Sequence, residues 1–372
     1  MNILYYFKDY EGFMSKWQYI HIIEELERIG HNITVYNPLG YNSIEESNTK
    51  IIPFIKNSKI KFDLFLNCES DIFLYTSSIK SIKELGLPTV LICFDNLHAP
   101  HLHQKMAPLF DVVWLTSIET KWMFENWGCK NIIFQSYAAN PYNFKPNWST
   151  PIHSVSFIGS PYGSRIDIFN SLTKEGVKCD VYADKLTGQT KIANKIPTPV
   201  KISVYEEVRR ALSFNIGRKV LISALLNRTV LKNKSILNLN SNLDIHPSVS
   251  FEDMQSIYSN SALSLNITYL RYTYLLAKPL HKIHLRTFEI PMCGGLEIAP
   301  YTDEIAGYFE DGKEIVLYKS EEEFISKAKF FLNQKNDDLC LQMKKAARKR
   351  AESEHTWTNR FDNIFDNLQL KK

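Results

Sequence analysis

The sequence predicts an α/β protein with two doubly wound parallel sheets, one in each half of the chain. Short apolar segments alternate with segments of helical period along the 372 residues, which is typical of parallel sheets whose strands are joined by helices. A turn-rich stretch, 140–151, with three prolines and three asparagines, interrupts this alternation, which then starts again. Because the length also fits about two domains, we expect two Rossmann-like halves in tandem.

The first half begins with a predicted strand over 2–7, a polar loop over 8–12, a helix and a second strand over 32–36. The helix is predicted from apolar residues on one face and a glycine at its end: Tyr19, Ile22, Ile23, Leu26, Ile29 and Gly30. Further strands are expected over 62–67, 89–94, 112–116 and 132–135, and helices over 77–85 and 118–127. Residues 1–145 are therefore predicted to form one domain.

The second half, 150–355, repeats the pattern. Strands are expected over 155–159, 178–183, 262–267, 295–299 and 314–318, with a helix over 165–175. The last segment, 356–372, is predicted to be a helix because its apolar residues share one face: Trp357, Phe361, Ile364, Phe365 and Leu368.

A basic insertion, 185–235, interrupts the second half. It holds seven lysines and four arginines against Glu206 and Glu207, a net charge of 11 − 2 = +9 in a chain whose total is +4. Residues 204–228 can form helices with one apolar and one basic face. Such a face either lies in water on an ordinary helical subdomain or contacts an anionic ligand or membrane surface.

Composition excludes several classes of protein. A net charge of +4 is too small to indicate nucleic acid as a partner. The six cysteines form no CxxC pair, which favours reduced thiols, and no signal sequence or long apolar segment is present, so we expect a cytoplasmic protein. Neither the 8–12 loop nor 159–163 has the GxGxxG spacing, and no Walker loop occurs, which disfavours dinucleotide oxidoreductases and P-loop enzymes.

The stretch 284–295 (HLRTFEIPMCGG) is the most specific part of the sequence. With 301–317 (YTDEIAGYFEDGKEIVL) and His355-Thr356-Trp357 followed by Arg360, it resembles the C-terminal half of GT-B glycosyltransferases, and among them the spore-maturation CgeB-like family. The resemblance extends to 157–160 with Arg165, and more loosely to 250–266. The N-terminal half is similar only in the order of its strands and helices. The resemblance implies a GT-B fold with a C-terminal helix that crosses back to the first domain.

The resemblance also implies a nucleotide-sugar site in the second domain. A carboxylate can accept hydrogen bonds from both ribose hydroxyls, and Glu289 takes this role by resemblance. Arg286 and Arg165 are the candidates to bind the diphosphate, next to the Gly159-Ser160 loop. The remaining candidates for donor binding are Tyr182, Ser250, Asn266 and Thr287. Two other interpretations remain open, namely an ion pair between Arg286 and Glu289, and an ordinary turn at Gly159.

Glu289 and Glu297 have the spacing of the paired glutamates of retaining glycosyltransferases, but the frame differs. By resemblance Glu289 is the second glutamate of that pair, so His281 stands where the first would be. We therefore interpret Glu297 as a structural residue of the following strand. His281 is a catalytic candidate at the position of a missing carboxylate, which leaves retention or inversion open.

The acceptor is expected at the carboxyl ends of the first domain's strands. Asp95 and His98 follow the strand 89–94 and are our candidates for the general base of an inverting enzyme. Asp9, Glu11 and Gly12 follow the first strand and are the candidates for acceptor binding. An alternative interpretation is a metal site formed by His98, His101 and His103. GT-B enzymes typically need no metal, so we expect no cofactor.

The sequence thus predicts a metal-independent, hexosyltransferase-like enzyme that moves a sugar from a nucleotide-sugar donor, with UDP-sugars favoured, to a glycan, protein or lipid-linked acceptor. Peripheral contact with an anionic membrane through 185–235 is one expectation, and nucleic acid is not an expected partner. Two alternatives remain open: a nucleotide-sugar epimerase or hydrolase on the same fold, and a catalytically degenerate, nucleotide-sugar-binding subunit of a surface-glycan pathway.

Overall fold

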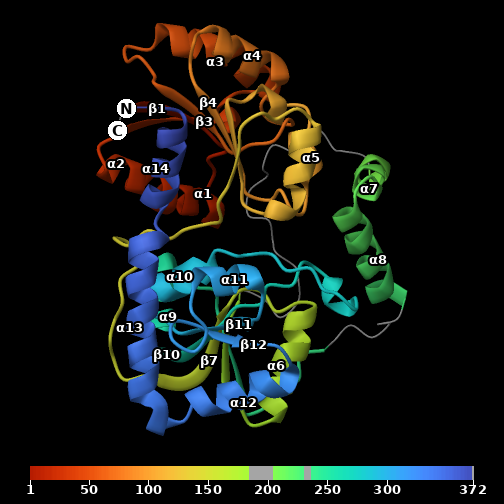
Figure 1. Ribbon diagram of the computed structural model, residues 1–372, viewed down its shortest axis with the longest axis vertical. Helices are drawn as coiled ribbons and strands as arrows, with labels where there is room; N and C mark the ends of the chain where they lie inside the picture. Colours follow the sequence, from red (N-terminus) through yellow and green to blue (C-terminus); the bar gives the residue numbers. More distant parts are fainter. Residues whose placement is uncertain (184–203, 230–235, 371–372) are drawn as a thin grey trace. The chain divides into compact units, whose positions relative to one another are not determined.

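The computed structural model describes residues 1–183, 204–229 and 236–370, which form two α/β units (Figure 1). The first unit takes residues 1–136, 204–218 and 357–370, and the second takes 137–183, 219–229 and 236–356. The predicted insertion lies partly outside the described residues, at 184–203 and 230–235. No helix in the described part of the chain is long and apolar enough to cross a membrane.

The first unit contains a six-stranded sheet in the order β2-β1-β3-β4-β5-β6. Its strands are β1 (Asn2–Tyr6), β2 (Asn32–Tyr36), β3 (Leu64–Asn67), β4 (Thr89–Cys93), β5 (Val112–Leu115) and β6 (Ile132–Phe134). All five pairings are parallel. The strand order reverses between β1 and β3, and loops from these two strands diverge there to opposite faces of the sheet.

Helices cover both faces of the first sheet. The elements are α1 (Phe13–Gln18), a π-helical turn (Tyr19–Ile23), α2 (Glu24–Arg28), α3 (Ile44–Asn57), α4 (Thr76–Glu84), α5 (Lys121–Asn126), α7 (Val204–Leu212) and the C-terminal α14 (Trp357–Asn367). Side chains of α3, α4 and α5 pack into one core with one face of the sheet. Helices α1 and α14 pack on the other face through aromatic contacts of Trp17, Trp114 and Trp357.

The C-terminal helix α14 is held to the first unit by polar as well as apolar contacts. Trp357 is fully buried, and its indole N–H donates to Nδ1 of His21 at 3.1 Å. The backbone N–H and the hydroxyl of Thr358 both donate to Glu25 Oε1, at 2.6 and 2.8 Å. Burial raises the pKa of the Glu25 carboxyl to about 7, although the bonds from Thr358 lower it.

The second unit contains a six-stranded sheet in the order β12-β11-β10-β7-β8-β9. Its strands are β7 (Ile152–Ile158), β8 (Cys179–Tyr182), β9 (Leu243–His246), β10 (Ser261–Leu265), β11 (Glu297–Pro300) and β12 (Val316–Tyr318). All are parallel. Chain order reverses between β7 and β10, so the crevice for a ligand is expected where these two strands end.

The helices of the second unit are α6 (Ser164–Lys174), α8 (Asn215–Thr229), α9 (Phe251–Asn260), α10 (Arg286–Met292), α11 (Asp303–Tyr308), α12 (Glu321–Phe331) and α13 (Asp337–Glu354). The first residues of α8 belong to the first unit. Helices α6 and α12 pack on one face of the sheet. Helix α13 packs beside α10, and two buried cations on it bond to backbone carbonyls: Lys344 donates to Ser259 and Ser261, and Arg348 donates to Phe144 and Met292.

The sequence located most strands to within one to three residues, and the α/β fold with two parallel sheets is confirmed. It did not identify α3 or the 18-residue α13. Helix α7, which lies in the predicted insertion of the second domain, is grouped with the first unit instead, and Phe214 next to it is buried in the core of that unit.

Candidate functional site

The carboxyl end of β7 forms the floor of the candidate donor site. Gly159 follows the strand with a φ of +142°, a conformation that side chains rarely adopt. A Cβ at this position would lie 2.6 Å from Nη2 of Arg286. Both the backbone conformation and the close guanidinium therefore favour glycine at position 159. An ordinary turn would account for the backbone conformation alone.

Arg286, at the start of α10, lies directly over this strand end. Its Nε and Nη2 donate to the carbonyl of Ile158 at 3.1 and 2.6 Å, and its guanidinium lies 5.0 Å from the ring centroid of Phe157. The carbonyl and the ring fix the guanidinium at the point where the chain order of the sheet reverses.

Arg165, in the first turn of α6, lies over the same ring. Its guanidinium is 5.2 Å from the centroid of Phe157 and 4.3 Å from that of Tyr162, and its Nη1 donates to the carbonyl of Ser160 at 2.8 Å. Burial and the positive charge of Arg286 lower the pKa of Arg165 to about 10. Two guanidinium groups are thus held near each other by neutral carbonyls and aromatic rings.

His284 lies in the same positively charged region but adds no charge to it. Burial, together with the charges of Arg286, Lys282 and Arg165, lowers the pKa of His284 well below its usual value. The imidazole is therefore neutral at physiological pH, and the arginines supply the charge. A site in which like charges raise one another's energy gains stability when an anion binds between them.

Glu289 lies one turn after Arg286 on α10 and is 4% exposed. Tyr258, on α9, is buried close to both residues: burial raises the pKa of its hydroxyl, the charge of Arg286 and a hydrogen bond to it lower that pKa, and the charge of Glu289 raises it. The structure therefore brings together Gly159, Arg286 and Glu289, three of the residues predicted for the donor site.

Asn266 and Thr287 form a buried polar cluster with Glu297 behind α10. The amide of Asn266 donates to Thr287 Oγ1 at 2.9 Å and to Glu297 Oε1 at 2.8 Å, and all three side chains are at most 2% exposed. Burial raises the pKa of Glu297 to about 8, against the hydrogen bond from Asn266 and the charge of Arg286. Glu297 lies in β11 as predicted. Asn266 and Thr287 hold α10 to the sheet from this buried position.

Tyr182 is the last residue of β8, and its carbonyl accepts from the backbone N–H of Gly159 at 3.0 Å; Ser250 directly precedes α9. The ring of Tyr182 stacks on His246 with centroids 4.5 Å apart, and Nε2 of His246 lies 2.9 Å from Asp180 Oδ1. Ser250 is the N-cap of α9, where its hydroxyl accepts from the backbone N–H of Asp253 at 3.1 Å. Ser160 is exposed and contributes its carbonyl to Arg165.

His281 lies on the long loop between β10 and α10. Its Nδ1 is 2.8 Å from Thr268 Oγ1, and its ring centroid is 4.9 Å from that of Tyr269. Burial lowers its pKa, so the imidazole is neutral near pH 7. It lines a cavity between α6 and α12.

In the first unit, the predicted acceptor residues lie at the end of β1. Asp9 accepts from the hydroxyl of Tyr19 at 2.8 Å and is held by two backbone bonds to Asn37. Gly12 is the extended N-cap of α1, where a Cβ would lie 2.6 Å from the ring of Tyr10. Glu11 beside it is exposed.

Glu69 is a candidate that the sequence reasoning missed. It follows β3, so it shares with the end of β1 the point where the chain order of the first sheet reverses. Its Oε1 accepts from the backbone N–H of Lys8 at 2.9 Å, and its Oε2 lies 3.3 Å from Lys8 Nζ. Burial raises the pKa of Glu69, although the charge of Lys8 lowers it. The sequence feature that could have identified Glu69 is its place as a carboxylate just after an apolar predicted strand.

Asp95 and His98 lie in one turn after β4. The carbonyl of Asp95 accepts from the backbone N–H of His98 at 3.1 Å; the Asp95 side chain is exposed and His98 is half-buried. Burial lowers the pKa of His103 to about 4. No group of His, Cys, Asp or Glu among the residues that the structure describes has the arrangement of a metal site.

Comparisons with known proteins bear on part of the chain and on its fold. Residues 207–366 match the model of a family described as glycosyl transferase-like. No curated protein matches the chain. Among solved structures, a glycosyltransferase from Rickettsia africae is similar over 100% of this chain and 99% of its own, with a TM-score of 0.61 at 12% identity.

Two further structures are similar over the whole chain. Anabaena HepE in complex with UDP-glucose has a TM-score of 0.57 at 12% identity and covers 99% of both chains. Sucrose-phosphate synthase from Thermosynechococcus elongatus has a TM-score of 0.56 at 11% identity and covers 99% of this chain and 98% of its own. The chain has the GT-B fold.

The GT-B fold that the resemblance implied is therefore confirmed, while membership of the CgeB-like family stays a prediction. The second half of the chain carries the glycosyl transferase-like segment. That segment includes Arg286, Glu289 and His281, together with the buried cluster around Asn266. The Gly159 loop and Arg165 precede it and join the same site in space.

Proposed function

We propose that this GT-B protein is a glycosyltransferase that takes a sugar from a nucleotide-sugar donor, with UDP-sugars favoured. The observation that carries the proposal is the pair of guanidinium groups over Phe157. Of the two, Arg286 has room beside Gly159 and lies one helical turn from Glu289. The glycosyl transferase-like match of residues 207–366 supports it. So does the similarity in fold to HepE, whose structures hold UDP-glucose or UDP.

In this proposal the two arginines bind the diphosphate, and Glu289 accepts hydrogen bonds from the ribose hydroxyls. Negative charge builds on the diphosphate as the bond to the sugar breaks, and permanent cations next to it lower the energy of the transition state. The carbonyl of Ile158 and the ring of Phe157 hold Arg286 in place before the ligand arrives. Because two cations already face the diphosphate, we propose that no metal is needed.

We propose that the acceptor hydroxyl is bound at the carboxyl edge of the first sheet. The general base is a carboxylate or an imidazole there: Asp95 and His98 after β4, or Glu69 after β3. Glu69 is favoured by its raised pKa and by its position where the chain order reverses. The acceptor itself is a glycan, a protein or a lipid-linked sugar.

His281 favours a second candidate, a catalytically degenerate subunit that binds a nucleotide-sugar without turnover. A neutral imidazole bonded to Thr268 cannot supply the negative charge that retaining relatives place near the sugar. Binding of UDP-sugars without any release of UDP would favour this candidate. Release of free sugar or of a rearranged donor with no acceptor present would favour a hydrolase or an epimerase.

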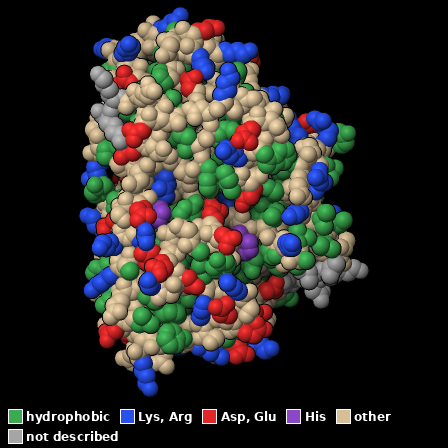
Figure 2. All heavy atoms as spheres, in the orientation of Figure 1, with side chains coloured by type: hydrophobic (Ala, Val, Ile, Leu, Met, Phe, Trp, Pro, Cys, Tyr) green, Lys and Arg blue, Asp and Glu red, His purple; other side chains and the backbone are tan. Residues whose placement is uncertain are grey.

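Contact with an anionic membrane is proposed for α7 and α8. Figure 2 shows hydrophobic and basic side chains intermixed on these helices, where Val204, Tyr205 and Leu212 are 75%, 76% and 51% exposed. Glu206 pairs with both Arg209 and Arg210, which reduces the free positive charge. Binding to vesicles with anionic lipid at low salt, and release at high salt, would support this contact. Absence of binding at low salt would remove it.

The proposed function is tested by thermal unfolding in the presence of UDP, GDP, dTDP, CDP, CMP and their common sugars, with EDTA or with Mg²⁺. A ligand at about 100 times its Kd stabilises the folded state by about 2.7 kcal/mol. The proposal expects a rise of the midpoint with UDP compounds that EDTA does not abolish. A protein that responds to none of these compounds would refute the donor site, and a response that EDTA removes would refute metal independence.

A further inference from the structure

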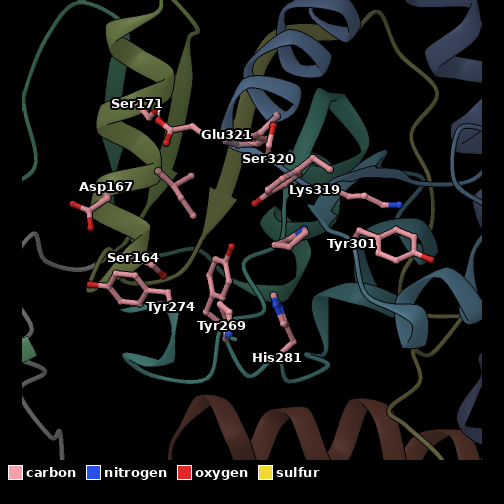
Figure 3. Close-up of a pocket in the computed structure, with 15 residues that line it drawn as sticks. Ser164, Asp167, Ser171, Tyr269, Tyr274, His281, Tyr301, Lys319, Ser320 and Glu321 are labelled. Carbon is pink, nitrogen blue, oxygen red and sulfur yellow. Dashed lines mark hydrogen bonds between the residues drawn. The ribbon is translucent and has the colours of Figure 1, made fainter. Parts of the chain in front are cut away.

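A cavity of about 500 Å³ lies in the second unit between α6 and α12, above the carboxyl ends of β11 and β12 (Figure 3). Its wall includes Ser164 and Asp167 of α6, and Lys319 and Glu321 near the start of α12. Neither of the two arginines, nor Gly159 or Glu289, lines it. His281, the candidate at the sugar position, does line it, so the cavity adjoins that position and lies away from the residues proposed to bind the diphosphate and the ribose. Its volume is within the range of roughly 300–1,000 Å³ that small-molecule sites occupy.

One wall of the cavity is a long loop closed by its own hydrogen bonds. The backbone N–H of Leu270 donates to Leu280 at 2.8 Å, and that of Lys282 donates to Thr268 at 2.7 Å. The fully buried hydroxyl of Thr273 bonds within the loop to the carbonyls of Leu270 and Leu280. This closure keeps the loop's side chains in fixed positions along the cavity.

Aromatic rings line the cavity on both sides. Tyr269 and Tyr274 extend from the loop, and Tyr301 lies opposite them after β11, as the sticks of Figure 3 show. Tyr301 is 37% exposed, and the hydroxyl of Tyr318 is buried in the wall with no hydrogen-bond partner among the described residues. The rings offer flat apolar faces, and their hydroxyls offer polar atoms at the rim.

The polar groups between the rings suit an uncharged ligand that carries many hydroxyls. Ser164, Ser320, Asp167 and Glu321 are among the lining residues. The hydroxyl of Ser320 already accepts from the backbone N–H of Glu323 at 3.2 Å, and Oε1 of Glu321 accepts from the hydroxyl of Ser171. Two carboxylates stand against one ammonium, that of Lys319, which lies 4.3 Å from the ring centroid of Tyr301. A phosphate or a nucleotide would meet net negative charge here, so the ligand chemistry differs from that of the two arginines.

We propose that this cavity binds a neutral saccharide, with pyranose C–H faces on the tyrosine rings and sugar hydroxyls on the serine and carboxylate oxygens. Aromatic faces satisfy the apolar side of a sugar ring, and carboxylates accept strong hydrogen bonds from its hydroxyls. The cavity shares His281 with the proposed function and none of the residues proposed to bind the diphosphate or the ribose. It would hold a sugar unit of a glycan while the arginine site holds the nucleotide.

The test is saturation-transfer NMR with the full chain and a panel of glucose, galactose, N-acetylglucosamine, maltose, cellobiose and chitobiose at up to about 10 mM, since weak sites have Kd values on the order of 1 mM. Tyr301→Ala and Tyr274→Ala are expected to weaken binding of the best saccharide by roughly tenfold, the loss of one well-packed aromatic contact. Tyr75→Ala is the matched control, because Tyr75 lies in the first unit and is 36% exposed.

Two comparisons separate this proposal from the proposed function. Saccharide binding should persist in Arg286→Ala, and UDP binding should persist in Tyr301→Ala. The saccharide site is overturned if no member of the panel binds, or if Arg286→Ala abolishes binding while both tyrosine variants keep it. It is also overturned if tetramethylammonium binds the cavity and no saccharide competes, which would make it a cation site.

Discussion

Replacing Arg286 by alanine should weaken UDP binding strongly without unfolding the protein. A guanidinium bonded to a diphosphate makes charge-assisted hydrogen bonds worth about 1.5–3 kcal/mol each. In the free protein the same group already donates twice to the carbonyl of Ile158, so part of this energy is exchanged when the ligand binds. We expect a net loss of about 2–4 kcal/mol, a rise in Kd of roughly 30- to 1,000-fold.

The substitution also removes the charge of Arg286, which adds to burial, the larger cause, in lowering the pKa of Arg165 to about 10. This relief partly offsets the lost contacts of Arg286 in the free protein, so the thermal midpoint should change little. Titration calorimetry with UDP measures the affinity, and circular dichroism confirms the fold. The control is Arg350→Ala, an arginine of the same unit whose side chain is 36% exposed and pairs with Glu314 and Glu354. Folded Arg286→Ala that binds UDP within about threefold of the wild type would refute the reasoning.

Three further predictions concern the strand end at Gly159, the buried cluster around Glu297 and the core of the first unit. Gly159→Ala places a Cβ 2.6 Å from Nη2 of Arg286 and should weaken UDP binding at least tenfold. The control is Gly176→Ala, also at positive φ but with nothing within 4 Å of the added Cβ, which should lower only the stability of the fold, by about 1 kcal/mol. Equal UDP affinity in the two variants would contradict this prediction. Burial raises the pKa of Glu297 to about 8, so between about pH 5 and 8 the folded state holds a proton that the unfolded state releases. The free energy of unfolding should therefore fall as pH rises through this range, by at most about 1.4 kcal/mol per pH unit. Chemical denaturation of Glu297→Gln at several pH values should lack this contribution to the fall. Trp357→Ala should destabilise the first unit by about 3–5 kcal/mol, seen as a large drop in the denaturation midpoint; an unchanged midpoint would mean that α14 is not part of that core.

The positions of most strands along the chain could be predicted because they depend on local patterns, and the candidate donor residues were named from a local motif. Alternating apolar segments fix where strands and helices lie, and the 284–295 stretch carries Arg286 and Glu289 in a specific spacing. The structure adds that Gly159 and Arg286 meet, a contact between residues 127 positions apart in sequence. A sequence pattern can indicate both residues but not their distance.

The sequence could not rank the candidates of the first unit. Asp95, His98 and Glu69 all follow apolar strands, and only the strand order shows that β1 and β3 are neighbours. That order puts Glu69 beside Lys8, which no spacing rule indicates. Pro53 inside α3 illustrates a second limit, because a proline normally argues against a helix there.

The cavity between α6 and α12 was also beyond the sequence. In the sequence, Tyr269 and Tyr274 are indistinguishable from buried aromatic residues of a long loop. Tyr301 lies more than twenty residues after them, so no short motif contains all three. They line one space only because the loop closes on itself and β11 ends beside it. Folding of the loop therefore creates a cavity that no motif indicates.

The most direct test of the central claim is a crystal structure of the protein with UDP. The account predicts the diphosphate between Arg165 and Arg286 at the end of β7, with the ribose hydroxyls on Glu289. Density for UDP in another place, such as the cavity lined by Tyr301, or a diphosphate that touches neither arginine, would contradict it.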